Sequence, residues 1–403
     1  MKKNILIWGC GLRGDDAYRI LDMSRKYNIT AFGDNNSHLW GTKKEGKTII
    51  GPHQLETLTD LDCILIASSY APEIKEQLTH LTTIPLYDNV EDLVYTNIII
   101  DISGFCNARC KWCVTGNKNR KEGIPKPKYM SYELFIKVYE HLYQNQIIEK
   151  FTEITLYNWG EPFLNPDYLK IIEYLSQKEH PFSVSTNASV LQYANNPNAY
   201  KYCTSFIFSM PGFSQSSYDK IHGFNFTKIK QNIINLNNNI NSCGFVGNGI
   251  IAYHVYHFNL HEISMANEFA NSLNYTFNPY YAYFNGNSMM ETYLKGNMED
   301  TMLKEAQSEI FLAHVPDFIS KASSDTHCFF EHQLAIDCDG NLVLCCAADS
   351  ACNNYTWGNI CEINSFEILK EKRQLMLKCD TCNKCRKLGI SHWIIGNRYI
   401  KNF

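Results

Sequence analysis

Three cysteines stand close together in the stretch DISGFCNARCKWC, residues 101–113, at the spacing Cys106-x3-Cys110-x2-Cys113. The apolar run TNIIIDIS overlaps its start and predicts a β-strand, so the three thiols lie in the loop at the C-terminal end of that strand. Parallel β/α sheets and barrels build their active sites on this rim. An iron–sulfur cluster usually takes four thiolates. Three thiolates on a four-iron cluster therefore leave one iron open for a ligand, as a catalytic zinc site keeps one position open.

Strands and helices alternate from residue 97 to about residue 312. The helix expected over residues 131–144 begins after Ser131, a residue type that caps helix N-termini. A run of strands, each followed by a helical stretch, argues for a parallel β/α array with the helices outside. Six strands are expected, over residues 96–103, 151–159, 182–187, 204–210, 245–256 and 275–284.

The triplet, with aromatic Trp112 before its last cysteine, resembles the signature of the radical S-adenosylmethionine (SAM) superfamily. In that family the open iron binds the amino and carboxylate groups of SAM. One electron from the cluster then cleaves the sulfonium, and the resulting 5′-deoxyadenosyl radical abstracts hydrogen from the substrate. The resemblance implies a partial (β/α)6 barrel, a catalytic 4Fe–4S cluster on Cys106, Cys110 and Cys113, and bound SAM. A zinc-binding loop is the alternative for the triplet alone.

Two further motifs follow the second and third predicted strands. YNWGEPFLNPD is similar to the family's glycine–glycine–glutamate–proline motif, with Trp159 in place of the first glycine. The resemblance implies that Gly160 and Glu161 face the methionine amino group of SAM. VSTNA matches the serine–threonine–asparagine segment that contacts the ribose and the carboxylate, which assigns Ser185 and Asn187 to SAM.

The stretch FSMPGFSQSSYDKIHGF occupies the place of a fourth family motif, serine-x-aspartate-glycine followed later by arginine-glycine. Ser209 is retained and is assigned to SAM by the resemblance. Pro211 and His222 stand in place of the usual aspartate and arginine, so this comparison does not assign the group that holds the SAM carboxylate.

Cysteines gather again beyond about residue 320, at Cys328, in DCDGNLVLCC (residues 337–346) and in CDTCNKC (residues 379–385). The pattern resembles the SPASM and twitch domains that follow some radical SAM barrels. Its glycine lets a hairpin turn back and bring remote cysteines together. No cysteine follows Cys385, which favours the shorter twitch form with one auxiliary 4Fe–4S cluster. The expected ligands are Cys328, Cys345, Cys382 and Cys385; Cys379 could replace either of the last two, Cys346 could replace Cys345, and a structural zinc site is the alternative to the cluster.

The front of the chain, ILIWGCGLRG, places Gly9, Gly11 and Gly14 between a predicted strand and a predicted helix, with Asp34 further on. This is the pattern of a dinucleotide fold, in which the glycines allow a tight turn and a close phosphate while the acid binds a ribose hydroxyl. The segment also resembles the front domain of bacterial sugar O-acyltransferases. That resemblance implies a nucleotide or a nucleotide-linked sugar as readily as NAD. A domain that only positions a partner is the alternative.

Charge and composition exclude several kinds of partner. The 37 lysines and arginines face 41 acids, a net charge of −4 with no basic run, which argues against nucleic acid or an anionic membrane. No apolar run approaches the roughly 18 residues that span a bilayer. No signal peptide opens the chain, so we expect a cytoplasmic protein with reduced thiols. The 16 cysteines then suggest metal ligation more than disulfides.

Together these patterns predict an α/β chain of three domains: a Rossmann-like domain over residues 1–92, a radical SAM partial barrel over 97–315 and a twitch-like domain over 320–403. The expected substrate is a sugar, an aminocyclitol or a nucleotide-linked sugar, which is dehydrogenated or epimerised in glycan or secondary-metabolite biosynthesis. A flavodoxin or ferredoxin would supply electrons. The alternatives are a maturase of a peptide or protein side chain and, more distantly, a non-catalytic protein that binds zinc and nucleotide.

Overall fold

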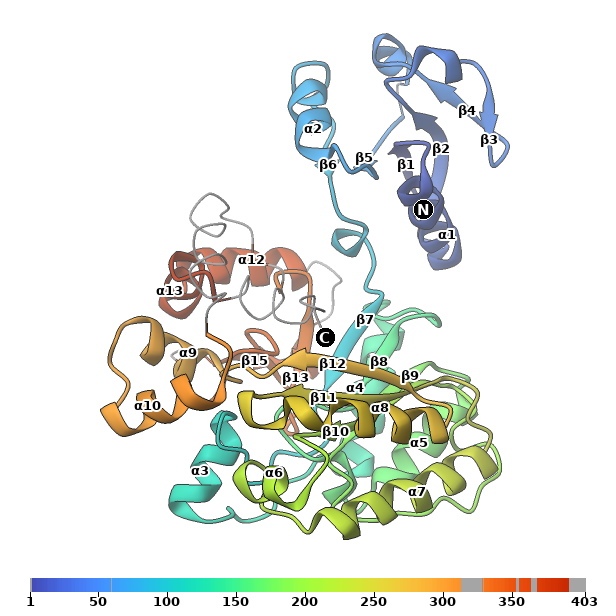
Figure 1. Cartoon of the computed structure of the whole chain (residues 1–403). Coiled ribbons are helices and arrows are strands. Elements are labelled where there is room, and N and C mark those ends of the chain that lie inside the picture. The colour runs from blue at the N-terminus through green and yellow to red at the C-terminus, as the bar shows by residue number, and fades with distance from the viewer. Residues whose placement is uncertain are drawn as a thin grey trace. The chain divides into compact units, whose positions relative to one another are not determined.

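The computed structural model describes residues 2–58, 60–312, 328, 330–352, 355–363 and 368–390. The chain divides into two compact units (Figure 1). The first contains Met1–Thr96 and Ile147–Phe151, and the second contains Asn97–Gln146 and Thr152–Phe403. The boundary expected at residues 315–320 lies outside the described residues.

The first unit is a doubly wound α/β sheet in which all strand pairs except the β3–β4 pair are parallel. Helix α1 packs on one face of the sheet, in a cluster that includes Ile5 and Leu21. Helix α2 packs on the other face, in a cluster that includes Leu6 and Leu78. The strand order is β3(Lys43–Lys44), β4(Lys47–Ile50), β2(Tyr27–Gly33), β1(Lys3–Trp8), β5(Cys63–Ile66), β6(Leu86–Tyr87), with helices α1(Leu12–Ser24) and α2(Ala71–Thr79) and short 3-10 turns η1(Ser37–Leu39), η2(Pro52–Thr57) and η3(Val90–Asp92).

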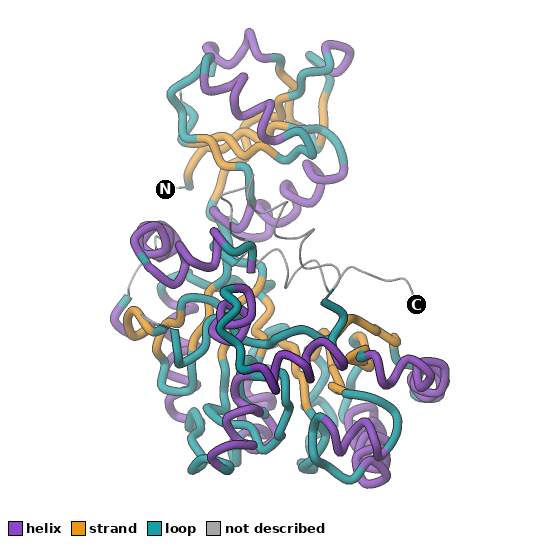
Figure 2. Tube along the Cα trace, turned by 60° about the vertical axis from the view of Figure 1, so that its left-hand side comes forward, coloured by secondary structure: helices purple, strands orange, loops and turns teal. Residues whose placement is uncertain are grey.

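The second unit contains the six parallel strands that the sequence predicts, in chain order across one curved sheet. Figures 1 and 2 show its helices packed around this sheet. The strands are β7(Asn97–Ile100), β8(Glu153–Thr155), β9(Phe182–Thr186), β10(Cys203–Met210), β11(Asn248–Val255) and β12(Thr276–Tyr281). The helices are α3(Val114–Glu122), α4(Tyr132–Gln144), α5(Tyr168–Gln177), α6(Gln215–Lys220), α7(Phe226–Ser242), α8(Ile263–Ser272), α9(Asn287–Leu294) and α10(Asp300–Glu309), with 3-10 turns η4(Pro162–Leu164) and η5(His257–Glu262).

Helix α4 illustrates how the sequence sets these elements. The Oγ of Ser131 accepts a hydrogen bond from the backbone N–H of Leu134 at 3.2 Å, so the predicted cap is present. The helix buries Phe135, Val138 and Leu142, which recur at the helical spacing and face the sheet.

The cysteine-rich end continues the same sheet. Strand β13(Leu334–Ile336) pairs in parallel with β7, and an antiparallel hairpin follows with β14(Asn341–Val343) and β15(Thr356–Asn359). After η6(Ile360–Glu362) come two helices, α12(Ile368–Lys378) and α13(Asp380–Lys387). The hairpin agrees with the sequence-based expectation, whereas the sequence analysis did not predict these two helices. The sequence of α13, DTCNKCRK, is strongly polar.

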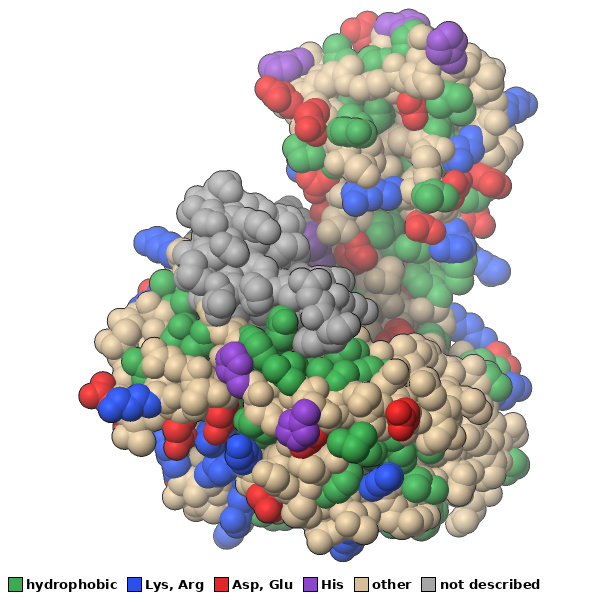
Figure 3. Space-filling model, viewed as in Figure 1, with side chains coloured by type: hydrophobic (Ala, Val, Ile, Leu, Met, Phe, Trp, Pro, Cys, Tyr) green, Lys and Arg blue, Asp and Glu red, His purple; other side chains and the backbone are tan. Residues whose placement is uncertain are grey.

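The surface agrees with the charge count. On the face of each unit visible in Figure 3, lysines and arginines lie among aspartates and glutamates, in keeping with the net charge of −4. Among the described residues, no helix has the length and apolar character that crossing a membrane would require.

Candidate active site

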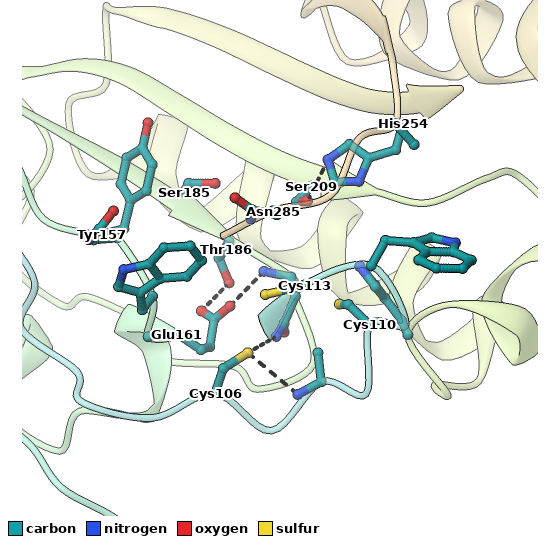
Figure 4. Close-up of a pocket in the computed structure, with 18 of the residues that line it drawn as sticks. Cys106, Cys110, Cys113, Tyr157, Glu161, Ser185, Thr186, Ser209, His254 and Asn285 are labelled. Carbon is teal, nitrogen blue, oxygen red and sulfur yellow. Dashed lines mark hydrogen bonds between the residues drawn. The ribbon is translucent and has the colours of Figure 1, made fainter. Parts of the chain in front are cut away.

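A cavity of about 180 Å³ opens at the C-terminal ends of the parallel strands in the second unit (Figure 4). Its lining comes from the loops and ends of β7, β8, β9, β10, β11 and β12, as expected where the carboxyl ends of parallel strands meet. The structure brings together here every residue that the sequence assigned to the catalytic cluster and SAM: Cys106, Cys110, Trp112, Cys113, Gly160, Glu161, Ser185, Asn187 and Ser209.

Residues of helix α3 contact the backbone of the cysteine loop and set its shape. The side-chain amide of buried Asn119 donates to the carbonyl oxygens of Cys106 and Ala108, both at 2.8 Å. Gly116 lies against the backbone of Cys110, where an added Cβ would stand 2.4 Å from the Cys110 nitrogen. These contacts with the loop backbone shape the cysteine loop, and the three thiols face one cavity.

The three thiols suit ligation of the iron ions of a cluster, because the positive charge of the metal would stabilise their thiolate forms. Burial is the main reason that the pKa of each thiol, in Cys106, Cys110 and Cys113, lies above its ordinary value. Bound metal deprotonates such thiols outright. The Cys106 sulfur also accepts from the backbone N–H of Ala108 at 3.4 Å and the side chain of Asn187 at 3.7 Å. Among the described residues, no three His, Cys, Asp or Glu side chains are arranged to hold a single metal ion.

Glu161 is fixed in the cavity wall beside Cys106, as Figure 4 shows. One carboxylate oxygen accepts from the Thr186 hydroxyl at 2.7 Å and the Phe163 N–H at 3.2 Å, and the other accepts from the Asn187 N–H at 2.7 Å. Burial raises the pKa of Glu161 to about 7, and these hydrogen bonds act in the opposite direction. A carboxylate so held is preorganised to meet a positive group in the cavity.

Asp101 holds the loop that carries Glu161, a role that the sequence analysis missed. Its carboxylate accepts from the backbone N–H groups of Trp159 at 2.8 Å and Gly160 at 3.2 Å. Burial raises the pKa of Asp101 to about 6, against the effect of these N–H groups. The available signal was an acid directly after a buried apolar strand.

We expect Gly160→Ala to destabilise the second unit by about 1–3 kcal/mol, the usual cost of overpacking. An added Cβ would stand 1.5 Å from the carbonyl oxygen of Ser103, so the backbone of the loop must move. Gly358→Ala is the matched control, since its Cβ would meet only the Cδ1 of Ile363 at 3.9 Å. Denaturant unfolding of the two variants checks this, and equal stability would contradict the tight approach.

Polar side chains on three neighbouring strands, β10, β11 and β12, meet in another part of the cavity lining. The Nε2 of His254 lies 2.6 Å from the Tyr280 hydroxyl and 3.4 Å from the Ser209 hydroxyl (Figure 4 labels His254 and Ser209). Burial lowers the pKa of His254 to about 4 and that of His222 to about 3, so both imidazoles are neutral near pH 7. The Nδ1 of His222 has no hydrogen-bond partner among the described residues.

Comparison with known proteins decides what this site belongs to. Residues 100–263, which contain the cysteine triplet and the three motifs after it, match the family model of the Radical SAM superfamily. Residues 100–263 are a radical SAM domain. This family implies a 4Fe–4S cluster and SAM, which the three cysteines and the motifs around the cavity fit. Residues 1–90 match a second family model, described as C2185-like, N-terminal.

Individual relatives are distant. The tungsten-containing aldehyde ferredoxin oxidoreductase cofactor-modifying protein of Pyrococcus furiosus is 26% identical over 97 residues, 23% of this chain and 24% of that protein. The match thus spans about a quarter of that relative's length. Streptococcus suis SuiB, solved with precursor peptide SuiA, has a TM-score of 0.48 and 11% identity over 79% of this chain and 83% of its own. AdoMet-bound anSMEcpe has a TM-score of 0.43 and 13% identity over 72% of this chain and 82% of its own.

Several residues that line the cavity of the radical SAM domain were not assigned to the site from the sequence. They supply hydroxyl, amide, imidazole and aromatic groups, and none of the described lining residues is a lysine or an arginine. Tyrosines occur on both faces of β12, and the sequence gives no sign of which face is inward. The unassigned lining residues include Tyr157, Asn158, Thr186, His254, Tyr256, Tyr280, Tyr283 and Asn285.

The C-terminal cysteines converge in one apolar cluster next to the radical SAM domain in the same unit. Cys328, Cys345, Cys382 and Cys385, the four expected ligands, line one small cavity. The alternatives Cys379 and Cys346 belong to the same apolar cluster without lining that cavity. Burial raises the pKa of the thiols in Cys328 and Cys345 to about 11. The donor set is therefore four thiols, two buried and two partly buried, which suits an iron–sulfur cluster.

A direct contact links this group of cysteines to the radical SAM motif. The indole N–H of Trp159 donates to the carbonyl oxygen of Ala348 at 2.8 Å, three residues beyond Cys345. Trp159 takes the place of a glycine in the family motif, so its side chain adds a connection that a glycine cannot make.

The glycine turn of the first unit connects the end of β1 to the start of α1. Gly9 has φ of 123°, and a Cβ there would stand 2.4 Å from the Ala67 carbonyl oxygen; a Cβ on Gly14 would stand 2.0 Å from the Gly9 oxygen. A Cβ on Gly11 would meet nothing within 4 Å. The Asp34 carboxylate accepts from the N–H groups of Cys10 at 3.0 Å and Asn36 at 2.9 Å, so it also stabilises the turn itself.

Proposed function

We propose that this protein cleaves SAM reductively and abstracts hydrogen from a hydroxyl-rich substrate, whose reacting sugar or cyclitol ring enters the cavity. The substrate is a sugar, an aminocyclitol or a nucleotide-linked sugar, and the outcome is dehydrogenation or epimerisation. The lining of the cavity carries this proposal. The neutral imidazole of His254, tyrosine hydroxyls and amides match sugar hydroxyls as donors and acceptors, and aromatic rings cover sugar C–H groups. The described lining residues offer no cation for a carboxylate or phosphate of the substrate.

The part of the cavity lining beside the three cysteines is proposed to hold SAM. Glu161 and Gly160 would face the ammonium, while Ser185, Asn187 and Ser209 would contact the ribose and carboxylate; all five line the cavity beside the three cysteines. The cluster, when bound, supplies the electron that cleaves SAM. Trp112 orients the cysteine loop, because its indole N–H donates to Glu309 at 2.9 Å.

His222 is proposed to take part of the role that arginine has in relatives. It lines the cavity and is only 2% exposed, and its Nδ1 has no partner among the described residues. Leaving a buried imidazole nitrogen unpaired is costly, so a hydrogen bond to SAM would satisfy it.

We further propose one auxiliary 4Fe–4S cluster on Cys328, Cys345, Cys382 and Cys385, supported by their common cavity. A flavodoxin or ferredoxin is the proposed electron donor.

For the first unit we propose nucleotide or nucleotide-sugar binding. A cavity of about 340 Å³ includes Gly9, Asp34, Ser68 and Tyr70 at the ends of β1, β2 and β5. This is the switch point of the sheet, where open α/β folds bind ligands. Gly9, Gly11 and Gly14 would form the phosphate turn, with Asp34 beside it.

The test is substrate-dependent formation of 5′-deoxyadenosine. Anaerobically reconstituted protein with SAM and reductant is offered neutral-sugar, nucleotide-sugar and peptide fractions, and the rate is compared with that without substrate. We expect a sugar or nucleotide-sugar fraction to raise the rate. Stimulation by the peptide fraction alone would overturn the proposed substrate class.

The variant His254→Ala should lower the sugar-stimulated rate by about tenfold, the cost of one hydrogen bond to substrate. Uncoupled SAM cleavage should fall less than the stimulated rate, because the Nε2 of His254 lies 3.4 Å from the proposed SAM residue Ser209 and closer, at 2.6 Å, to the Tyr280 hydroxyl. His261→Ala is the matched control, an exposed histidine just beyond β11 whose side chain is 76% exposed. Loss of uncoupled and stimulated cleavage in equal measure would contradict a substrate-side role for His254.

A further inference from the structure

A buried lysine lies beside the C-terminal cysteines. Lys372 on α12 is 1% exposed. Its ammonium donates to the carbonyl oxygen of Phe330 at 2.9 Å and to that of Gln333. Both carbonyls belong to the segment between Cys328 and β13. The charge is thus held by neutral dipoles on the same segment that brings Cys328 to the site.

Lys372 forms no ion pair with a carboxylate among the described residues; the lysine ion pairs nearest along the chain involve Lys295 and Lys384. Burying an ammonium without a counter-charge costs several kcal/mol. Burial lowers the pKa of Lys372, and the thiols of Cys345, Cys328, Cys346 and Cys382 act in the opposite direction. As neutral thiols they cannot balance the ammonium, whereas as cluster-bound thiolates they can.

We propose that Lys372 is the counter-charge of the auxiliary cluster and raises its reduction potential. The inference rests on the auxiliary cluster of the proposed function. Reduction adds one negative charge to the cluster, and a fixed positive charge in a dry interior stabilises that state more than the oxidised one. Lys372 is a positioning residue in this role, since it contacts backbone carbonyls rather than substrate.

This charge favours dehydrogenation over epimerisation. In dehydrogenation, the hydroxyl-bearing carbon radical would lose one electron and its hydroxyl proton to become a carbonyl. A cluster held by Cys328, Cys345, Cys382 and Cys385 would supply the acceptor for that electron, and neutral His254 could take the proton. Epimerisation returns a hydrogen atom to the carbon and needs no electron acceptor.

The test is made in the full chain with Cys106, Cys110 and Cys113 replaced by Ala, so that only auxiliary iron remains. Lys372→Met is added in this background, and the midpoint potential is followed by electron paramagnetic resonance during a redox titration. We expect a negative shift of at least about 59 mV, a tenfold change for one electron. Lys378→Met is the control, an exposed lysine on the same helix, and its effect should be screened by solvent.

Each outcome decides. Unchanged potential with iron retained would overturn the role of Lys372 and leave the cluster standing. A parent without iron, or with zinc, would overturn the auxiliary cluster itself and the inference with it. If Lys372→Met loses iron, Lys372→Arg decides: recovered iron supports the counter-charge, and continued loss makes Lys372 a packing residue and overturns it.

Discussion

Replacing Cys106, Cys110 and Cys113 by Ala is expected to abolish SAM cleavage while about four irons per chain remain. The three thiols line the cavity together with Glu161, and no other cysteine lines it among the described residues. The remaining iron belongs to the C-terminal cysteines, which form a separate cavity. 5′-Deoxyadenosine measured by mass spectrometry and iron analysis of the same preparation check both parts.

Cys361→Ala is the control for the triple variant. Cys361 is half-buried in η6 and lines neither cysteine cavity, so both cleavage and iron content should stay unchanged. If the triple variant still forms 5′-deoxyadenosine, the catalytic cluster is not bound by these three cysteines. If the triple variant loses all its iron, the proposed auxiliary cluster is contradicted instead.

Glu161→Gln should weaken SAM binding by roughly 10- to 150-fold, since a hydrogen bond to a charged group contributes about 1.5–3 kcal/mol. The Glu161 carboxylate is fixed in the cavity wall by hydrogen bonds from Thr186, Phe163 and Asn187. We therefore expect no other side chain to move into its place and supply the lost charge. Anaerobic calorimetry of SAM binding measures the Kd.

Glu140→Gln provides the comparison for that variant. Glu140 lies on α4, outside the cavity, where it pairs with Lys178 at 2.8 Å. It should bind SAM as the parent does. A Kd for SAM that is the same in Glu161→Gln and in the parent would contradict the placement of the SAM ammonium at Glu161.

The barrel and its cysteine loop could be predicted because their signals are local. Each motif directly follows an apolar strand, and parallel strands place their carboxyl ends on one rim. Cys106, Glu161, Ser185 and Ser209 therefore meet although they are far apart in sequence. The predicted strands also include flanking residues that the structure leaves in loops.

The rest of the site depends on tertiary contacts that leave no periodic signal. Helix α3 buries Gly116 and Asn119 rather than an apolar stripe, so its sequence does not predict a packed helix. The role of Asp101 depends on the Trp159 loop, whose backbone N–H donates to the Asp101 carboxylate only in the folded chain. Lys372 stands in the charged stretch ILKEKRQLMLK, where nothing distinguishes the buried lysine from the exposed ones.

The most direct test of the proposed function follows deuterium. Anaerobically reconstituted protein with SAM and reductant is given deuterated sugar and nucleotide-sugar fractions, with a deuterated peptide digest in parallel, and 5′-deoxyadenosine is analysed by mass spectrometry. We predict that deuterium enters 5′-deoxyadenosine from the sugar or nucleotide-sugar fraction. Deuterium arriving only from the peptide digest would contradict the account.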